Sequence, residues 1–139
     1  MSLIKIINLP TNEIEFKIVQ LYHNNEAVML CGSRKLGIRN YHYAILEDYL
    51  KENNIAFDTF APNLEYPRFF VPRLEKENVY KVAGMGFAGI DQPIKYFQLP
   101  YGSSKDYKIE PDKEFQKILR EIFKEDSSYW EELKNTAKN

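Results

Sequence analysis

The hydrophobic pattern predicts a hairpin near the start of the chain. Residues 14–22 begin with strict alternation, a period of two that is typical of a strand with one buried face. We expect one face of this strand to carry Ile14, Phe16 and Ile18, and the other to carry Glu15 and Lys17. Residues 23–26 are polar and predict a turn. The apolar residues 27–31 then predict a second strand, antiparallel to the first.

Two longer segments have the apolar spacing of helices. The first covers residues 41–53 and has Asn40 as its expected N-cap. Its apolar positions recur at helical spacing: Ile45, Leu46, Tyr49 and Leu50. The second begins with Pro111 at its first position. Its apolar residues recur every three or four positions: Phe115, Ile118, Leu119, Ile122 and Phe123. Ser128 and Glu131 have the spacing of a capping box and predict a short third helix.

The rest of the hydrophobic pattern predicts further strands, so the expected fold class is α+β. Three further strands are predicted, over residues 55–61, 78–83 and 95–99. Three prolines follow the strand predicted over residues 55–61: Pro62, Pro67 and Pro72. They predict a loop or an edge strand in this segment. We expect a small, mostly antiparallel sheet with two to three helices packed against it. A chain of 139 residues fits a single compact domain, over residues 1–139.

Composition and charge narrow the classes of function. The chain has 19 basic and 20 acidic residues, so its net charge of −1 argues against nucleic acid as a partner. Cys31 is the only cysteine, so the chain cannot form an internal disulfide or a zinc site built on several cysteines. We interpret Cys31 as a small buried side chain. No unbroken apolar segment resembles a signal peptide or a membrane span. We therefore expect a cytoplasmic protein without membrane contacts, cofactors or bound metal.

The segment Gly84–Gly89 matches G-x-G-x-x-G, the pattern of dinucleotide-binding loops. That function requires a helix that opens at the third glycine, and Pro93 followed by a strand-like segment argues against one. We interpret the glycines as a bulge, a tight turn or a place of close backbone packing. The alternative is a backbone nest in which Gly84 and Gly86 bind an anionic ligand.

A basic segment, residues 31–42, is the most suggestive candidate site. It carries three cations and no acid, and it runs from a strand into a helix start, where unpaired backbone N–H groups favour anions. The candidate ligand-binding residues in it are Ser33, Arg34, Lys35 and Arg39. The alternative is an ordinary surface loop whose cations pair with acids such as Glu47 or Asp48.

His42 lies in the first turn of the first predicted helix and shares a face with apolar residues of that helix. We interpret it first as a packed, hydrogen-bonded histidine. The functional alternative is a catalytic general acid/base or nucleophile beside the basic segment. The N-terminus of the helix would lower its pKa and favour the neutral imidazole that a nucleophile requires.

Two short patches of the chain are similar to the Janus/Ocnus phosphohistidine phosphatases. The similarity is carried by Tyr41-His42 at a helix start, by Val79-Tyr80 and by Met85-Gly86-Phe87. In that family a histidine at a helix start is the catalytic residue and lies beside a phosphate-binding backbone, so the resemblance would imply this role for His42. The family's Gly-Gly-Gly-Arg-Ile segment and its later histidine have no counterpart here. We assign the chain to no family from these residues.

Ten tyrosines and nine phenylalanines exceed what one small core requires. Several lie in or beside the proline-rich and glycine-rich segments: Tyr66, Phe69, Phe70, Tyr80, Tyr96, Phe97 and Tyr101. Filling of the core is the first interpretation; a protein-binding face that includes residues 67–72 is the second, and base stacking is the third. The sequence thus favours a small binding or interaction domain, such as an inhibitor or accessory protein, with a protein or a small anionic ligand as partner. The alternative is a small enzyme that acts on a phosphorylated or other anionic substrate through residues 31–42 and His42.

Overall fold

The computed structural model describes residues 4–63, 65, 69–91 and 96–123. Its elements, in chain order, are β1 (Lys5–Ile7), β2 (Asn12–His23), β3 (Glu26–Gly32), the 3-10 segment η1 (Arg34–Asn40), α1 (His42–Glu52), β4 (Thr59–Phe60), β5 (Val71–Pro72), β6 (Glu75–Lys76), β7 (Tyr80–Asp91), β8 (Tyr96–Tyr101) and α2 (Lys113–Ile122).

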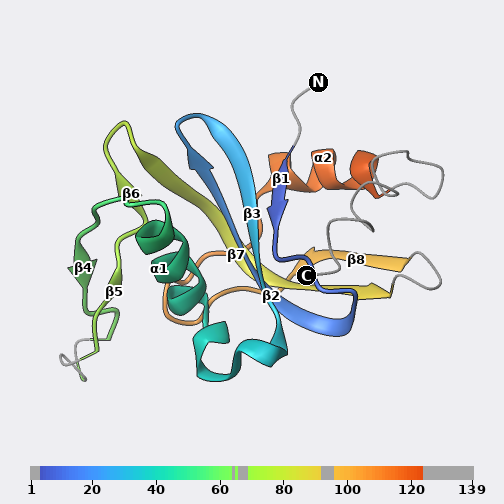
Figure 1. Cartoon of the computed structure of the whole chain (residues 1–139), viewed down its shortest axis with the longest axis horizontal. Coiled ribbons are helices and arrows are strands. Elements are labelled where there is room, and N and C mark those ends of the chain that lie inside the picture. The colour runs from blue at the N-terminus through green and yellow to red at the C-terminus, as the bar shows by residue number, and fades with distance from the viewer. Residues whose placement is uncertain (1–3, 64, 66–68, 92–95, 124–139) are drawn as a thin grey trace.

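These elements form a mixed α+β structure, as expected. The main sheet has the strand order β1-β3-β2-β7-β6, and β8 pairs with the far end of β7. All of its pairs are antiparallel except the pair of β1 with β3. Figure 1 shows the two helices of the described part on different sides of the sheet. The third helix predicted from Ser128 lies outside the described residues.

The predicted hairpin is confirmed. Strands β2 and β3 pair from His23↔Glu26 to Lys17↔Gly32, so only two residues form the turn. Both of these, Asn24 and Asn25, have positive φ angles, of 51° and 68°. A two-residue hairpin turn that matches the twist of the strands requires this conformation, and asparagine tolerates it better than most residues.

The expected burial of Ile14 is wrong. Its side chain is 90% exposed, whereas Phe16 and Ile18 are buried as predicted. The register between β2 and β7 shifts between Glu13 and Phe16, and this bulge turns Ile14 out of the alternation. Gly89 of β7 makes room for the bulge, because a Cβ atom there would collide with the carbonyl oxygen of Ile14.

Strand β7 continues through the glycine-rich segment instead of ending at residue 83 as predicted. A Cβ atom on Gly84 would lie 2.6 Å from the amide nitrogen of Asp112 and from the carbonyl oxygen of Glu110. A Cβ atom on Gly86 would collide with the carbonyl oxygen of Tyr101. The glycines thus allow other parts of the backbone to cross β7 closely, which favours the packing interpretation of the motif.

The predicted apolar positions of both helices pack toward a core, although Ile118 and Phe123 are only partly buried, and the helices begin at other residues than predicted. In α1 the N-cap is Tyr41, without a side-chain capping bond, because η1 extends through the predicted cap, Asn40. In α2 the N-cap is Asp112, whose carboxylate accepts a hydrogen bond from the amide of Phe115. Pro111 therefore precedes this helix instead of occupying its first position.

Two apolar cores lie on the two faces of the sheet. The core beneath α2 includes Phe16, Ile18, Met29, Cys31, Ala88, Phe115, Leu119 and Ile122. The core beneath α1 includes Val19, Leu21, Leu30, Ile45, Leu46, Tyr49, Leu50 and Met85. Adjacent residues of β2 alternate between the two cores, as the period of two requires. Burial of each large side chain contributes about 1.5–3 kcal/mol.

The segment between α1 and β7 is less regular than predicted. Of the strand expected over residues 55–61, only Thr59–Phe60 pairs, with Val71–Pro72, in a separate two-stranded sheet. Pro72 is tolerated in this position because proline lacks a backbone N–H group, and a pair of two-residue strands contains few ladder hydrogen bonds that need one. Helix α1 packs on β2, β3 and β5.

Candidate functional site

The start of η1 binds a carboxylate of the chain itself, that of Glu13. The hydroxyl of Ser33 donates a hydrogen bond to one carboxylate oxygen of Glu13, and the amide of Arg34 donates to the other at 2.8 Å. The amide of Lys35 donates to the hydroxyl of Ser33 at 3.1 Å. These bonds fasten the bulged part of β2 to the junction that the sequence had suggested as an anion site.

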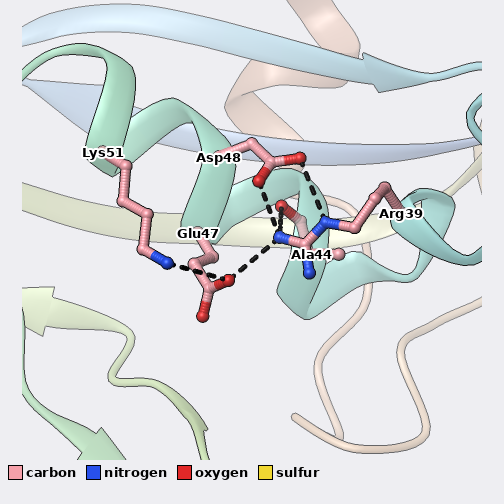
Figure 2. A network of polar contacts seen from close by, with 5 residues as sticks. All are labelled: Arg39, Ala44, Glu47, Asp48 and Lys51. Carbon is pink, nitrogen blue, oxygen red and sulfur yellow. Dashed lines mark hydrogen bonds and ion pairs between the residues drawn. The ribbon is translucent and has the colours of Figure 1, made fainter.

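Arg39 forms the second internal contact of the basic segment (Figure 2). Its Nη2 lies 2.6 Å from Asp48 Oδ1 and 2.9 Å from Glu47 Oε1, and it also donates to the carbonyl of Ala44 at 3.4 Å. Hydrogen bonding to Asp48 raises the pKa of the guanidinium further above its usual value. Glu47 in turn pairs with Lys51 at 3.4 Å. For Arg39, the interpretation as a loop cation paired with acids of the helix is confirmed.

The other two cations of the segment lie at the surface. Nη2 of Arg34 is 3.6 Å from Glu15 Oε1, and its side chain is 69% exposed. Lys35 is exposed as well. Arg34 and Arg39 therefore contact different carboxylates, on β2 and on α1, and are not directed together at one ligand position.

His42 is buried where α1 begins, with 8% of its surface exposed. Its Nε2 donates a hydrogen bond to the carbonyl of Gly86 at 2.8 Å, and its ring meets Phe87 edge-on at 5.5 Å. Burial lowers the pKa of the imidazole, and the hydrogen bond to Gly86 opposes that shift. A neutral ring held in this tautomer has Nδ1 as its basic atom.

Of the two predicted glycine ligands, Gly86 contacts the basic segment at His42. Gly86 meets His42 through its carbonyl oxygen, an acceptor, and not through an N–H group that could bind an anion. Gly84 faces the chain before α2, where Gln20 accepts a hydrogen bond from the amide of Asp112 at 2.7 Å. Of the seven residues predicted for the site, the structure brings together His42 with Gly86, and Ser33 with Arg34 and Lys35.

A different group of side chains gathers on the face of the sheet that carries α1. Cross-strand pairing places Gly32, Lys17, Phe87 and Tyr101 in one row through β3, β2, β7 and β8. Tyr41 lies over this row, since the ammonium of Lys17 is 4.5 Å from the centre of its ring. We call this group and its neighbours on β2 and β8 the tyrosine face: Glu15, Lys17, Tyr41, Phe87, Tyr96 and Tyr101.

The tyrosines of this face are exposed and held by neighbours. Tyr41, Tyr96 and Tyr101 are 50%, 51% and 40% exposed. The hydroxyl of Tyr101 donates to Glu15 at 3.1 Å, and the ring of Tyr101 lies 6.1 Å from that of Phe87. Burial and the nearby carboxylate of Glu15 raise the pKa of the Tyr101 hydroxyl, so it stays protonated at neutral pH.

The remaining aromatic residues singled out from the sequence divide between core and surface. Tyr80 is buried, Phe97 stacks on Phe123 at 3.7 Å, and Phe69 packs edge-on against Tyr43 at 5.0 Å. Phe70 is 57% exposed. Tyr66, Pro67 and Arg68 lie outside the described residues.

Lys17 is the site residue that sequence reasoning did not identify. Among the described residues, Lys17 is the only lysine that is partly buried; the others are exposed. Desolvation lowers the pKa of its ammonium. The alternation of β2 assigned it to the polar face, but only the cross-strand register reveals its aromatic neighbours. Glu13 and Glu15 were missed as internal partners for the same reason.

The thiol of Cys31 is buried in the core beneath α2, and its burial raises the pKa of the thiol. This agrees with its interpretation as a small buried side chain, since the thiolate is the reactive form. Within the part of the chain that the structure describes, no three His, Cys, Asp or Glu side chains come together as metal ligands. No helix in that part has the length and apolar character needed to cross a membrane.

Comparison with known proteins found no matching family model, no similar curated protein and no similar solved structure.

Proposed function

We propose that this chain is a protein-binding domain and that its tyrosine face is the surface that contacts the partner. The observation that carries the proposal is the exposure of Tyr41, Tyr96 and Tyr101 on one face of the sheet. Tyrosine is enriched at the energetic centres of protein interfaces, because its ring buries a large apolar area while its hydroxyl forms hydrogen bonds.

The arrangement of the face favours binding because little of it must be ordered on contact. Tyr101 is held by Glu15, and the hydroxyl of Tyr96 donates to Gln98 Oε1 at 2.6 Å. Tyr41 stacks on Tyr43, with ring centres 5.9 Å apart and planes within 10° of parallel. Side chains that are already ordered lose less conformational entropy when a partner binds, so more of the contact energy becomes affinity.

The enzymatic alternative has one supporting observation, the neutral imidazole of His42. Against it, several groups that would hold an anionic substrate already bind carboxylates of the chain. Ser33 and the amide of Arg34 bind Glu13, and Arg39 binds acids of α1. The geometry therefore supports binding through the tyrosine face better than catalysis through the basic segment.

In vivo cross-linking and mass spectrometry test this proposal. Wild type is compared with the Tyr96→Ser/Tyr101→Ser double variant and with Phe70→Ser, an aromatic residue of similar exposure outside the tyrosine face. We expect a protein captured by wild type and by Phe70→Ser but lost from the double variant. The purified partner should bind the double variant at least about tenfold more weakly. Equal affinity for all three, at equal melting temperatures, would contradict the proposal.

A further inference from the structure

The contacts of Lys17 differ from those of Arg34, Arg39 and Lys51 in the same region. Arg34, Arg39 and Lys51 each lie within 4 Å of a carboxylate oxygen. The ammonium of Lys17 has no ion pair and no hydrogen bond to any described residue. It lies 4.5 Å from the centre of the Tyr41 ring, in a cation–π contact.

The acids closest to Lys17 are not available to it. Glu15 lies two residues away on β2, but its carboxylate accepts the hydroxyl of Tyr101 and pairs with Arg34. Asp106 influences Lys17 only through its electric field and forms no ion pair with it. Lys17 has therefore lost part of its hydration without gaining an anionic partner within the described chain.

From this we propose that the protein partner presents a carboxylate side chain to Lys17, beside the ring of Tyr41. This inference rests on the proposed function, because it names the chemistry of the group that the tyrosine face binds. A partly desolvated ammonium regains its lost interactions when its N–H groups donate hydrogen bonds to an anion. Aromatic walls strengthen the pair by keeping water away from it.

Two carboxylates act on the charge of Lys17 from a distance. Glu15 and Asp106 both act on the ammonium through their fields. Both fields raise the pKa of the ammonium and so oppose the effect of its desolvation.

Two probe peptides test the inference: acetyl-Phe-Glu-Phe-amide and acetyl-Phe-Gln-Phe-amide, which differ only in the charge of the central side chain. Their affinities are measured by NMR titration, with the amide signals of Lys17, Tyr41 and Phe87 as the reporters. The proteins are wild type, Lys17→Met and the control Lys113→Met, an exposed lysine at the start of α2. Lys17→Gln serves as a second variant if Lys17→Met lowers the melting temperature.

We expect wild type and Lys113→Met to bind the Glu peptide at least about fivefold more tightly than the Gln peptide. In Lys17→Met the preference should fall to about one. Equal binding of the two peptides by wild type, a preference that survives in Lys17→Met, or no binding of either peptide would overturn the inference. Equal binding that still shifts Tyr96 and Tyr101 would leave the proposed function intact, whereas the cross-linking experiment tests that function independently of Lys17.

Discussion

The Nε2 of His42 donates a hydrogen bond to the carbonyl oxygen of Gly86 at 2.8 Å, and this bond joins the first turn of α1 to the middle of β7. It accounts for two features of the sequence with one contact. The glycine-rich strand exposes a carbonyl group to the helix, and the histidine at the helix start has the donor to satisfy it. The sequence pattern alone predicts both residues as candidates for a ligand site.

Burial of the His42 imidazole makes stability depend on pH in a defined direction. Burial lowers the pKa of His42 in the folded state, while in the unfolded chain it is about 6.5. The unfolded state therefore binds a proton more readily, so the contribution of His42 is complete above about pH 6.5 and is lost as the pH falls. Urea unfolding of wild type and His42→Gln should show a larger difference at pH 7.5 than at pH 5. A difference that does not change with pH would contradict this account.

The Arg39 contacts should stabilise the fold more than the exposed pair of Arg34. Arg39 binds Asp48, Glu47 and a backbone carbonyl, and its side chain is 39% exposed against 69% for Arg34. Allowing for screening by solvent, Arg39→Ala should cost about 1 kcal/mol and Arg34→Ala less than about 0.5 kcal/mol. Chemical unfolding at low and high salt measures both, and equal losses would show that the Arg39 contacts are no stronger than a surface pair.

The core beneath α2 depends on Phe115, which is fully buried and packs edge-on against Tyr22 at 5.4 Å. Phe115→Ala should reduce the free energy of unfolding by about 3–5 kcal/mol, because it removes a large side chain and leaves a cavity. Lys117→Ala, on the exposed side of the same helix, is the control and should change it by less than about 0.5 kcal/mol. A small effect of Phe115→Ala would mean that α2 does not pack on the sheet.

Close backbone packing at β7 predicts that Gly84 cannot be enlarged. A methyl group there would meet main-chain atoms of Glu110 and Asp112 at 2.6 Å, and these cannot move aside like a side chain. Gly84→Ala should therefore destabilise the protein by about 1–3 kcal/mol, which thermal or urea unfolding can measure. If the glycine served only a ligand, Gly84→Ala would leave the stability of the free protein unchanged.

Local sequence patterns predicted the parts of the fold that depend on local spacing. The alternation before Asn24 and Asn25 predicted the hairpin, and the helical spacing that includes Phe115 and Leu119 predicted the buried face of α2. The short strands β1 and β6 were missed because two or three residues carry no measurable period. Ile14 was misplaced because its bulge depends on the space at Gly89, a residue distant in sequence.

The candidate site shows the same division between near and distant contacts. The acids that bind Arg39 lie eight and nine residues away and were among the partners considered from the sequence. Glu13 lies twenty residues before Ser33, and only the pairing of β2 with β3 brings the two together. Lys17 likewise became a candidate only when the register placed it beside Phe87 and beneath Tyr41.

The most direct test of the tyrosine face is hydroxyl-radical footprinting of the chain alone and in complex with the partner identified by cross-linking. The account predicts that Tyr41, Tyr96 and Tyr101, which are 40–51% exposed in the free chain, become protected from oxidation in the complex. Phe70, of similar exposure, should be oxidised equally in both states. Oxidation of the three tyrosines at the same rate with and without the partner would contradict the claim that this face is the binding surface.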